Sequence, residues 1–410
     1  MSVLTDHCGT ALPTEPGYGG NNLADLFESC GTLVAQGSIT PDPHPLHGAG
    51  RHDLLGLADR LRAAGVDPTR YRSVCLVMVD GLGQSLLTAY GSYAPFLKKA
   101  IQLGPIHSAV PSTTVASLSS LGTATPPGYH GMAGYEVRNP ATGTVMNQLS
   151  GWDKAVDPHQ WQPHPTVFER YQNHLDVAMV SLSKYAGTGL SEAGLRGGRF
   201  VHAAGYAART TLAASLLNSR KPSLVYLYWG EIDQAGHKFG TRSDQWLEQL
   251  EELNLALKSL ARRLPPHVLL LVTADHGMVD IAPENRIDYS GDTALLENIE
   301  LTAGEPRMVQ LYLKDTSPSA RQDALGRWAD AWGDQAWVFD SEELFEAGYF
   351  GQPVTDEARR RIGDIIVAAR EPVALYDMRH YKPHALQMVG QHGSLTLDET
   401  QVPLLMLPTG

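Results

Sequence analysis

Short apolar segments that end in acidic or small polar residues are the feature that most constrains the fold of this chain. Four of them occur after residue 70, at residues 73–81, 177–183, 223–233 and 267–277. Continuous apolar runs of this length are typical of central strands that are buried on both faces of a sheet. Three of the runs end in a carboxylate, at Asp80, Asp233 and Asp275. The sequence therefore predicts a buried sheet with acidic side chains at its edge.

Helical patterns lie between these predicted strands. Residues 53–65 and 243–264 carry apolar side chains at positions i, i+3, i+4 and i+7. Strands that alternate with helices predict an α/β fold, in which a central, mostly parallel sheet has helices on both faces. In such sheets ligands bind at the carboxyl ends of the strands, where the three carboxylates are expected.

Composition varies along the chain and predicts its organisation. The 410 residues, 43% of them hydrophobic, can bury a sizeable core. Residues 1–50 are interrupted by Gly and Pro and predict an N-terminal arm that wraps the surface. Residues 51–410 are predicted to form a single domain. Within it, residues 283–390 break the strand and helix rhythm with an acidic, Trp-containing segment, which predicts a small inserted cap or subdomain.

Charge and cysteine content exclude some classes of protein. With 32 Lys and Arg against 44 Asp and Glu, the net charge of −12 opposes stable binding to nucleic acid. Three cysteines without CxxC spacing fit a reducing compartment. No apolar stretch approaches the length of a membrane span, so we expect no membrane partner and a cytoplasmic location. The sequence does not indicate an oligomeric state.

Polar residues near the predicted strand ends form a candidate metal site. The set contains three carboxylates and three imidazoles: Asp80, Asp233, His237, Asp275, His276 and His392. Six such ligands suit two divalent ions with three protein ligands each, and the absence of thiolates favours Zn²⁺, with Mn²⁺ or Fe as alternatives. A single Asp after a strand also serves as a helix cap, and a single loop His is often only solvated. Four motifs together, each with a neighbouring Gly, favour the metal site.

A hydroxyl-rich segment, residues 111–132, is the second candidate element. A helix is predicted to begin at Thr114. A hydroxyl there lies beside free N–H donors and the positive end of the helix dipole, where a phosphoryl oxyanion is stabilised. Metal coordination would lower the pKa of the Thr114 hydroxyl and make it a nucleophile. The alternative is that Ser112, Thr113 and Thr114 only cap the helix.

The order of these motifs resembles a known family. VMVDGLG, PSTT, GEIDQAGH, TADHG and QHG follow one another as in the alkaline phosphatase superfamily, over residues 70 to 405 approximately. TADHG is shared with metal-dependent phosphomutases, whereas the DxxGH element at residues 233–237 and the Thr of PSTT are more similar to the nucleotide pyrophosphatase/phosphodiesterase family. The resemblance implies an alkaline-phosphatase-like fold and a small phosphoester or nucleotide substrate.

The resemblance also implies roles for individual residues. Thr114 would be the nucleophile and would contact both zinc ions. Asp80, Asp275 and His276 would hold one ion, and Asp233, His237 and His392 the other. The implied reaction is hydrolysis of phosphodiester or pyrophosphate bonds through a phosphothreonine intermediate.

Substrate contacts are less well defined by the sequence. Tyr135 occupies the position where nucleotide phosphodiesterases usually carry an Asn that donates to the phosphoryl group. Lys184 and Arg307 are candidate phosphate contacts, with surface salt bridges as the alternative. Four aromatic residues could stack on a base or belong to the core: Trp152, Tyr185, Tyr228 and Trp229. Asp377 and His384 are candidates to orient His392.

Four other functions compete with this interpretation. A phosphonate hydrolase of the phosphonoacetate type would use a similar Thr and the same ligands, so it stays an alternative. The PSTTVAS segment lacks the Cys or Ser context of a sulfatase. Asp80 and Thr114 are only 34 positions apart, which leaves no room there for the inserted domain of a phosphomutase. A metal-stabilised binding protein without turnover is a further alternative, although binding alone does not require Thr114.

Overall fold

The central element of the fold is a seven-stranded sheet. The computed structural model describes residues 4–35 and 39–410. The strand order is β2 (Ile101–Gln102), β19 (Leu405–Leu407), β9 (Val268–Thr273), β1 (Ser73–Val79), β8 (Ser223–Trp229), β6 (Asp176–Ser181) and β7 (Arg199–His202). β9, β1, β8, β6 and β7 run parallel, whereas β19 is antiparallel to both β9 and β2. The predicted mostly parallel sheet is confirmed.

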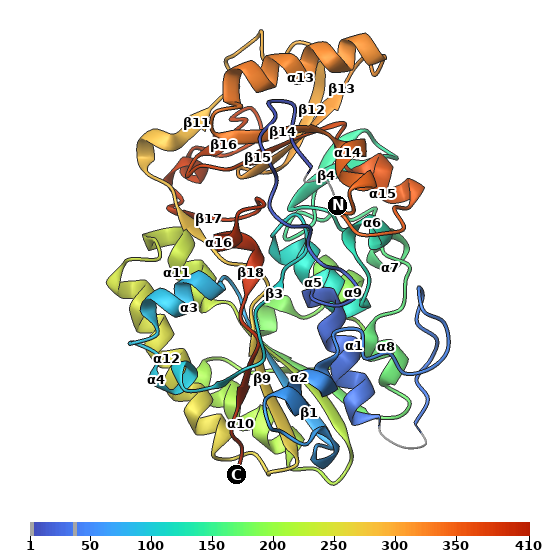
Figure 1. Cartoon of the computed structure of the whole chain (residues 1–410), viewed down its shortest axis with the longest axis vertical. Helices are drawn as coiled ribbons and strands as arrows, with labels where there is room; N and C mark the ends of the chain where they lie inside the picture. Colours follow the sequence, from blue (N-terminus) through green and yellow to red (C-terminus); the bar gives the residue numbers. More distant parts are fainter. Residues whose placement is uncertain (1–3, 36–38) are drawn as a thin grey trace.

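Helices cover both faces of this sheet (Figure 1). One side holds α1 (Leu23–Val34), α2 (Leu57–Ala63), α5 (Thr114–Thr123) and α8 (Val167–Tyr171), and the other holds α10 (Tyr206–Leu217) and α12 (Asp244–Ala261). Every residue of β1, β8 and β9 is buried, which explains their continuous apolar sequence. Within residues 4–35 and 39–410, no helix has both the length and the apolar character needed to cross a membrane.

The N-terminal region differs from the predicted surface arm. Residues 23–34 form α1, which is almost wholly buried and contacts α5, β1 and β8. Leu23, Leu26, Phe27 and Cys30 are spaced at i, i+3, i+4 and i+7, so they form an apolar stripe that belongs to the core. Asn22 begins the helix with a capping box. The prediction is wrong for this segment because flanking Gly and Pro residues obscured the stripe. Residues 1–3 and 36–38 of the predicted arm lie outside the described residues.

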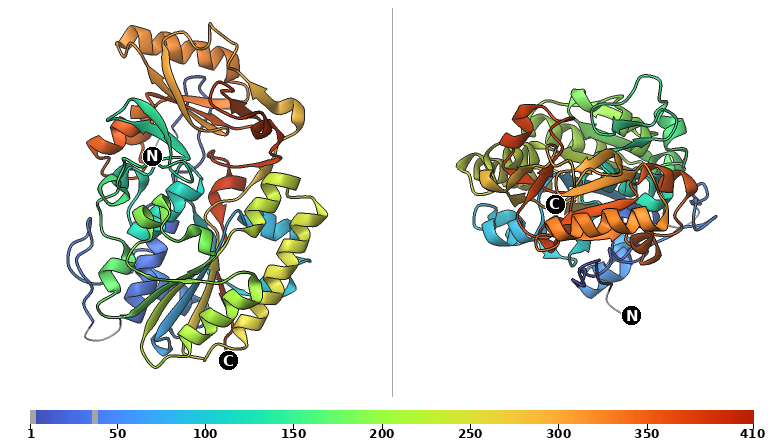
Figure 2. Two further views of the ribbon diagram at one scale, coloured as in Figure 1. Left: turned by 180° about the vertical axis from the view of Figure 1, so that it is seen from behind. Right: turned by 90° about the horizontal axis from the view of Figure 1, so that it is seen from above.

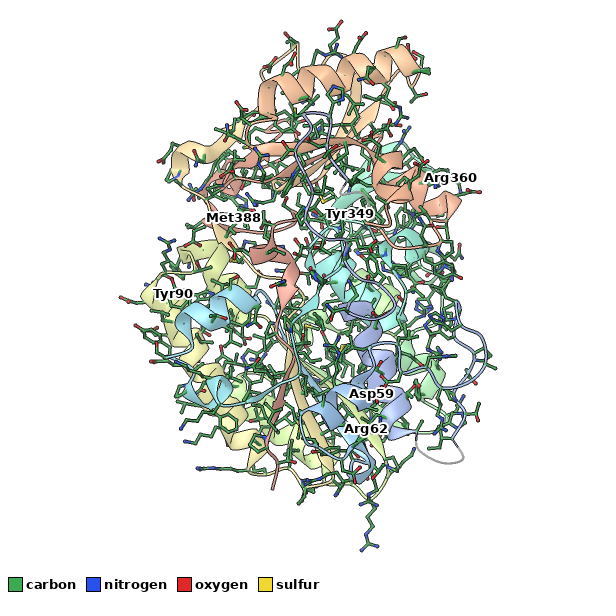
Figure 3. All side chains as sticks on the ribbon, in the orientation of Figure 1. Asp59, Arg62, Tyr90, Tyr349, Arg360 and Met388 are labelled. Carbon is green, nitrogen blue, oxygen red and sulfur yellow. The ribbon has the colours of Figure 1, made fainter. Side chains whose placement is uncertain are left out.

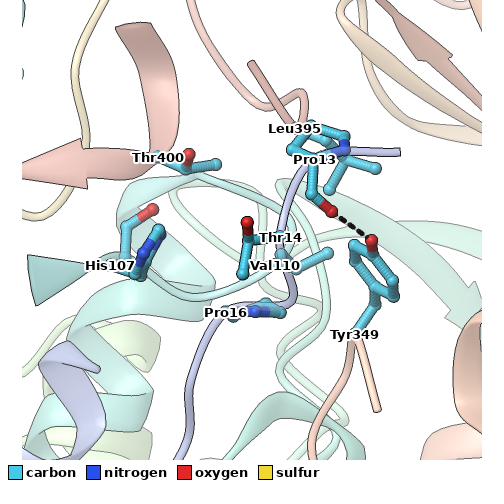
Figure 4. Close-up of a pocket in the computed structure, with 9 residues that line it drawn as sticks. Pro13, Thr14, Pro16, His107, Val110, Tyr349, Leu395 and Thr400 are labelled. Atoms are coloured by element: carbon cyan, nitrogen blue, oxygen red, sulfur yellow. Dashed lines mark hydrogen bonds between the residues drawn. The ribbon is translucent and has the colours of Figure 1, made fainter. Parts of the chain in front are cut away.

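The chain before α1 contacts residues 337–350, which lie far from it in the sequence. Leu12 packs into an apolar cluster with Phe339 and Phe350. The Trp337 indole N–H donates to the Ala11 carbonyl at 3.1 Å. Figure 4 shows a small pocket beside this segment, where the Tyr349 hydroxyl donates to the Pro13 carbonyl. The N-terminal segment therefore links the main sheet to the second sheet described next.

A second sheet lies within the region predicted as a cap or subdomain. Its strands, in order, are β12 (Ile299–Glu305), β13 (Met308–Leu313), β15 (Ile365–Ala369) and β14 (Ala336–Asp340), all antiparallel. Helix α13 (Pro318–Trp332) packs on this sheet and shares with it an apolar cluster that includes Leu311, Trp328 and Val367. We call residues 286–376 the second lobe. It lies at one end of the elongated molecule, opposite the C-terminus (Figure 2).

Shorter elements complete the chain. The remaining helices are α3 (Gln84–Tyr90), α4 (Pro95–Lys98), α6 (Pro127–His130), α7 (Pro158–Trp161), α9 (Gly189–Gly194), α11 (Glu231–Phe239), α14 (Ser341–Glu346), α15 (Asp356–Arg361) and α16 (Leu397–Thr400). The remaining strands are β3 (Ile106–His107), β4 (Glu136–Asn139), β5 (Thr144–Asn147), β10 (Val279–Asp280), β11 (Arg286–Asp288), β16 (Ala374–Tyr376), β17 (Gly390–Gln391) and β18 (Gln401–Val402).

Candidate active site

The six candidate metal ligands converge at the carboxyl ends of neighbouring strands. Asp80 follows β1 directly, and Asp275 and His276 follow β9. Asp233 and His237 lie one helical turn apart on α11, which begins after β8. Because β9, β1 and β8 are adjacent and parallel, their carboxyl ends meet at one edge of the sheet. His392 comes from farther along the chain, immediately after β17.

The structure separates these residues into two groups of three. Asp80, Asp275 and His276 offer ligand atoms that all lie within 4.8 Å of one another, and so do Asp233, His237 and His392. The first group is fully buried and the second is partly exposed. The rings of His276 and His392 stack with centroids 3.5 Å apart, so the two groups are neighbours. This is the division that the family resemblance implied.

The three imidazoles all present Nε2 to the carboxylates, because Nδ1 of each ring is bound elsewhere. Their Nδ1 atoms lie 2.9, 2.7 and 2.9 Å from the carbonyl oxygens of Gly277, Gly390 and Ser112, for His276, His237 and His392 respectively. A carbonyl oxygen only accepts, so Nδ1 carries the proton in each ring. Nε2 is then free to bind a metal ion, and a carbonyl on Nδ1 is the usual partner of a metal-binding histidine.

Two of the three carboxylates, those of Asp275 and Asp80, accept hydrogen bonds through one oxygen each. Asp275 Oδ1 accepts from the backbone N–H groups of Gly81 and His276 at 3.2 and 3.1 Å. Asp80 Oδ2 accepts from the Tyr228 hydroxyl. The other oxygens, Asp80 Oδ1 and Asp275 Oδ2, are buried without a hydrogen-bond partner, as is Asp233 Oδ1. Each of them faces a histidine Nε2 atom, at 3.2, 3.7 and 3.3 Å respectively. Buried anionic oxygens of this kind require a cation, so the residues fit a divalent metal ion at each group.

A glycine at the end of β1 allows the two groups to approach each other. Gly81 has φ of 76°, a conformation that favours glycine. A Cβ atom at this position would lie 3.1 Å from both Cα and Cβ of Asp233. The Asp80–Gly81 step therefore lets the carboxylate of one group sit directly beside the helix that carries the other.

Electrostatics distinguish the two groups. Burial alone would lower the pKa of His276, but the charges of Asp275 and Asp80 outweigh burial and raise it to about 10. Burial lowers the pKa of both His237 and His392. Burial, together with the charge of Asp80, raises the pKa of Asp275 and Asp233 well above the ordinary value. A metal ion would thus replace a proton on His276 but not on the two histidines of the other group.

Thr114 is positioned as the sequence predicted, at the first residue of α5. Thr113 is the N-cap and accepts from the Ala116 N–H at 3.4 Å, so the capping role belongs to Thr113. The Thr114 Oγ1 atom lies 3.2 Å from Nε2 of His276. The candidate nucleophile is therefore in contact with the first group of ligands and lies at the positive end of a helix.

A large cavity opens above these residues. Its volume is about 1070 Å³, and Thr114, Asp80, Asp233, His237 and His392 line it. The second lobe and the chain that follows it contribute further walls, including Glu305, Tyr376 and Tyr381. Met388, labelled in Figure 3, also lines the cavity and lies near the boundary between the second lobe and the main sheet. The cavity is large enough for a small organic ester in contact with Thr114.

The structure separates the three predicted substrate contacts. Tyr135 and Lys184 line the cavity, and Lys184 Nζ lies 4.8 Å above the Tyr185 ring. Arg307 does not line it. Its guanidinium is buried, pairs with Glu399 at 2.6 Å and donates to three backbone carbonyls. The prediction that Arg307 reaches a substrate phosphate is wrong, because its guanidinium group binds Glu399 and backbone carbonyls within the fold.

Other predicted residues also resolve into different roles. Trp152, Tyr185 and Tyr228 line the cavity, whereas Trp229 is a buried core residue stacked on Tyr206. His384 lines the cavity, but the partner of His392 Nδ1 is the Ser112 carbonyl. Asp377 instead accepts from Thr302 and Arg379.

Two functional candidates escaped the sequence analysis. The sequence predicts that Tyr228 either stacks on a base or belongs to the core, but its hydroxyl also anchors Asp80. Its position one residue before the end of β8 was the available signal. Glu305 was overlooked beside Arg307 in the same GEPR segment, although its carboxyl group lines the cavity. No local pattern could have shown which of the two side chains points inward.

The fold and the site together define the class of this protein: a hydrolase with an alkaline-phosphatase-like α/β fold that acts on phosphoric esters or anhydrides. The chain belongs to the type I phosphodiesterase / nucleotide pyrophosphatase family, whose model matches residues 74–395. A comparison of the sequence with curated proteins finds no significant match.

Solved structures share the fold at low sequence identity. Murine ectonucleotide pyrophosphatase / phosphodiesterase 5 is 16% identical, with a TM-score of 0.61 over 81% of this chain and 87% of the other. An inactive form of the same murine protein, in complex with AMP, is 15% identical, with a TM-score of 0.59 over 81% and 87%. Phosphonoacetate hydrolase from Sinorhizobium meliloti 1021, in complex with phosphonoacetate, is 21% identical, with a TM-score of 0.61 over 83% and 91%.

Proposed function

We propose that this protein hydrolyses phosphodiester or pyrophosphate bonds with Thr114 as nucleophile and two divalent metal ions as cofactors. The observation that carries the proposal is the convergence of three Nε2 atoms and three carboxylate oxygens, which have no hydrogen-bond partner, in two groups joined by the stacked His276 and His392 rings. Oxygen and nitrogen ligands without thiolate favour Zn²⁺.

The residues divide between the two ions as the geometry groups them. Asp80, Asp275 and His276 would hold the ion beside Thr114, and Asp233, His237 and His392 would hold the second. Such ions supply Lewis acidity, which favours ionisation of the attacking hydroxyl and stabilises charge on the leaving oxygen.

The chain's own groups perform the covalent steps. Thr114 Oγ forms a bond to phosphorus while the bond from phosphorus to the leaving oxygen breaks, which gives a phosphothreonine and a free alcohol or phosphate. The N-terminus of α5 places backbone N–H groups and the helix dipole beside the phosphoryl oxygens. Water then adds to phosphorus, Thr114 leaves with a proton, and the phosphate product is released.

Phosphonate hydrolysis is the second candidate. It is favoured by the shared fold with phosphonoacetate hydrolase, which is bound to phosphonoacetate in its crystal structure. In that reaction the same attack on phosphorus would break a carbon–phosphorus bond and release acetate. The two candidates share Thr114 and the six ligands but need different walls around the leaving group.

The deciding experiment measures kcat/KM of the zinc-loaded protein for four substrates: bis-p-nitrophenyl phosphate, p-nitrophenyl phosphate, p-nitrophenyl phenylphosphonate and phosphonoacetate. We expect the diester to be preferred over the monoester, and phosphonoacetate to be turned over poorly. T114A serves as the matched control and should retain its metal while losing turnover. Preference for phosphonoacetate would favour the second candidate, and equal rates in T114A would contradict both.

A further inference from the structure

Glu305 lines the cavity and carries a buried carboxylate oxygen that has no hydrogen-bond partner. The residue ends β12 at the tip of the hairpin with β13, and only 5% of its surface is exposed. Oε2 accepts from the backbone N–H of Tyr135 at 2.9 Å. Oε1 is buried and has no hydrogen-bond partner. No step of the proposed reaction uses this carboxyl group.

The side chain of Glu305 passes between two turns that belong to the active site. Gly393 follows the ligand His392, and a Cβ atom there would lie 2.4 Å from Cγ of Glu305. Gly134 follows the loop after the nucleophile helix, and a Cβ atom there would lie 3.5 Å from Oε2. The carboxyl group is therefore close to the side of the site that holds His392.

A second carboxyl group lines the same part of the cavity. Glu136 follows Tyr135 directly, and its Oε2 atom accepts from the Tyr381 hydroxyl at 3.3 Å. The rings of Tyr381 and Tyr376 are nearly perpendicular, at 84°, with centroids 5.7 Å apart. Carboxylates near tyrosine rings are surroundings in which proteins bind organic cations, because the face of an aromatic ring attracts a cation.

Neither glutamate has a cationic partner among the residues that the structure describes. Lys184 and Lys382 also line the cavity, yet no ion pair joins either of them to Glu305 or Glu136. Burial raises the pKa of both glutamates. A cation seated beside them would oppose that shift and satisfy Oε1 of Glu305.

We propose that Glu305 and Glu136 select phosphodiesters in which one ester group carries a primary ammonium. The inference rests on the proposed phosphodiesterase function and names the substrate class for it. A primary ammonium provides both the positive charge and the N–H donors that Oε1 of Glu305 lacks. The same two carboxylates repel a carboxylate or a second phosphate, so they disfavour phosphonoacetate and long polyphosphates at this subsite.

The test uses three diesters that share a p-nitrophenyl leaving group and differ in charge at the end of the other ester group. The 3-aminopropyl ester is cationic, the n-butyl ester is its neutral counterpart of equal length, and the 2-carboxyethyl ester is anionic. We expect kcat/KM of the zinc-loaded protein to fall in that order, with about tenfold or more between the cationic and neutral esters, as a charged hydrogen bond provides.

Variants of the two glutamates then test whether these residues cause the preference for the cationic ester. E305Q keeps the acceptor for the Tyr135 N–H, and E136Q keeps one for Tyr381, so both preserve shape while removing charge. Each should reduce the ratio of the cationic to the neutral ester by several-fold, and the double variant should bring it near one. E284Q removes an exposed glutamate away from the cavity and should leave the ratio as in the wild type.

The outcomes distinguish a failure of the proposed ammonium selectivity from a failure of the proposed phosphodiesterase function. A wild-type ratio near one, or a ratio unchanged in both E305Q and E136Q, overturns the selectivity even if the diesters are hydrolysed. Absence of turnover for all three esters and for bis-p-nitrophenyl phosphate, with metal bound, overturns the phosphodiesterase function instead. If E305Q fails to fold, the wild-type series and E136Q still decide the question.

Discussion

The carboxyl edge of the main sheet and the wall contributed by the second lobe place their functional groups by different means. At the sheet edge, Asp80 and Asp275 lie at strand ends, where the backbone fixes them and N–H or hydroxyl donors anchor them. In the other wall, Glu305 lies in a hairpin and Tyr381 in a loop, and each is brought to the cavity by packing between lobes. We infer that the sheet edge supplies the chemistry and the second lobe the choice of substrate.

Removal of a metal ligand should have the largest effect and would test the role of the sheet edge. In D275N we expect kcat/KM to fall about 10³-fold or more, because an anionic ligand of the site beside Thr114 is lost. Metal analysis should find one ion fewer per chain. Y381F, in the other wall, should keep full metal content and show a smaller change, mainly in KM. Equal metal loss in both variants would contradict the division between the two regions.

Removal of Arg307 should have a large effect on stability rather than on substrate binding. R307A leaves Glu399 buried without its partner, so the free energy of unfolding should fall by about 3–5 kcal/mol. Urea denaturation measures this change. R359Q breaks an exposed pair with Glu342 and should lower stability by about 0.5 kcal/mol or less. A selective rise in KM in folded R307A would restore the substrate role that the structure argues against.

Two tyrosines on β8 provide a matched pair with a moderate expected effect. Tyr228 donates to Asp80, whereas the buried hydroxyl of Tyr226 has no hydrogen-bond partner. Y228F should weaken zinc binding about 10- to 100-fold, because a group that orients a ligand is removed. Y226F should bind zinc as the wild type does. Calorimetric titration of metal-free protein measures both, and identical affinities would show that the Asp80 anchor is unimportant.

The effect of pH on metal binding should be smaller and should differ between the ligand groups. The raised pKa values of Asp275 and His276 mean that metal binding at their group releases protons. Zinc stabilisation there should therefore decrease as pH falls from 8 to 6, approximately. In the other group only Asp233 has a raised pKa, whereas His237 and His392 have lowered pKa values, so metal binding there releases fewer protons. The zinc-induced rise in Tm, measured at each pH for wild type and D233N, should fall more steeply in D233N.

Much of the main sheet and its site could be predicted from sequence because both depend on local patterns. The runs that became β1, β8 and β9 are apolar throughout, since both faces are buried. Asp80 and Asp275 follow from the ends of those runs. Helix α1 was missed although its apolar stripe is equally regular, because the surrounding Gly and Pro residues suggested irregular structure.

The second lobe was harder to predict because its residues act through distant partners. Glu305 and Arg307 lie two residues apart in one hairpin, yet one lines the cavity and the other pairs with Glu399. Hydropathy at this turn does not distinguish them. The contact of Glu305 with the Gly393 turn depends on how the hairpin docks, and no pattern within the GEPR segment encodes that.

The sequence by itself determined the types of the candidate ligands, the candidate nucleophile and the parallel sheet that places strand ends together. The reason is that strand burial and strand termination are local properties of a chain. Only the tertiary structure decided how the six candidate ligands divide into two groups, which oxygens have no hydrogen-bond partner, and which residues of the second lobe line the cavity. Those outcomes depend on contacts between residues that are far apart in sequence, such as Asp80 with Tyr228 and Glu305 with Tyr135.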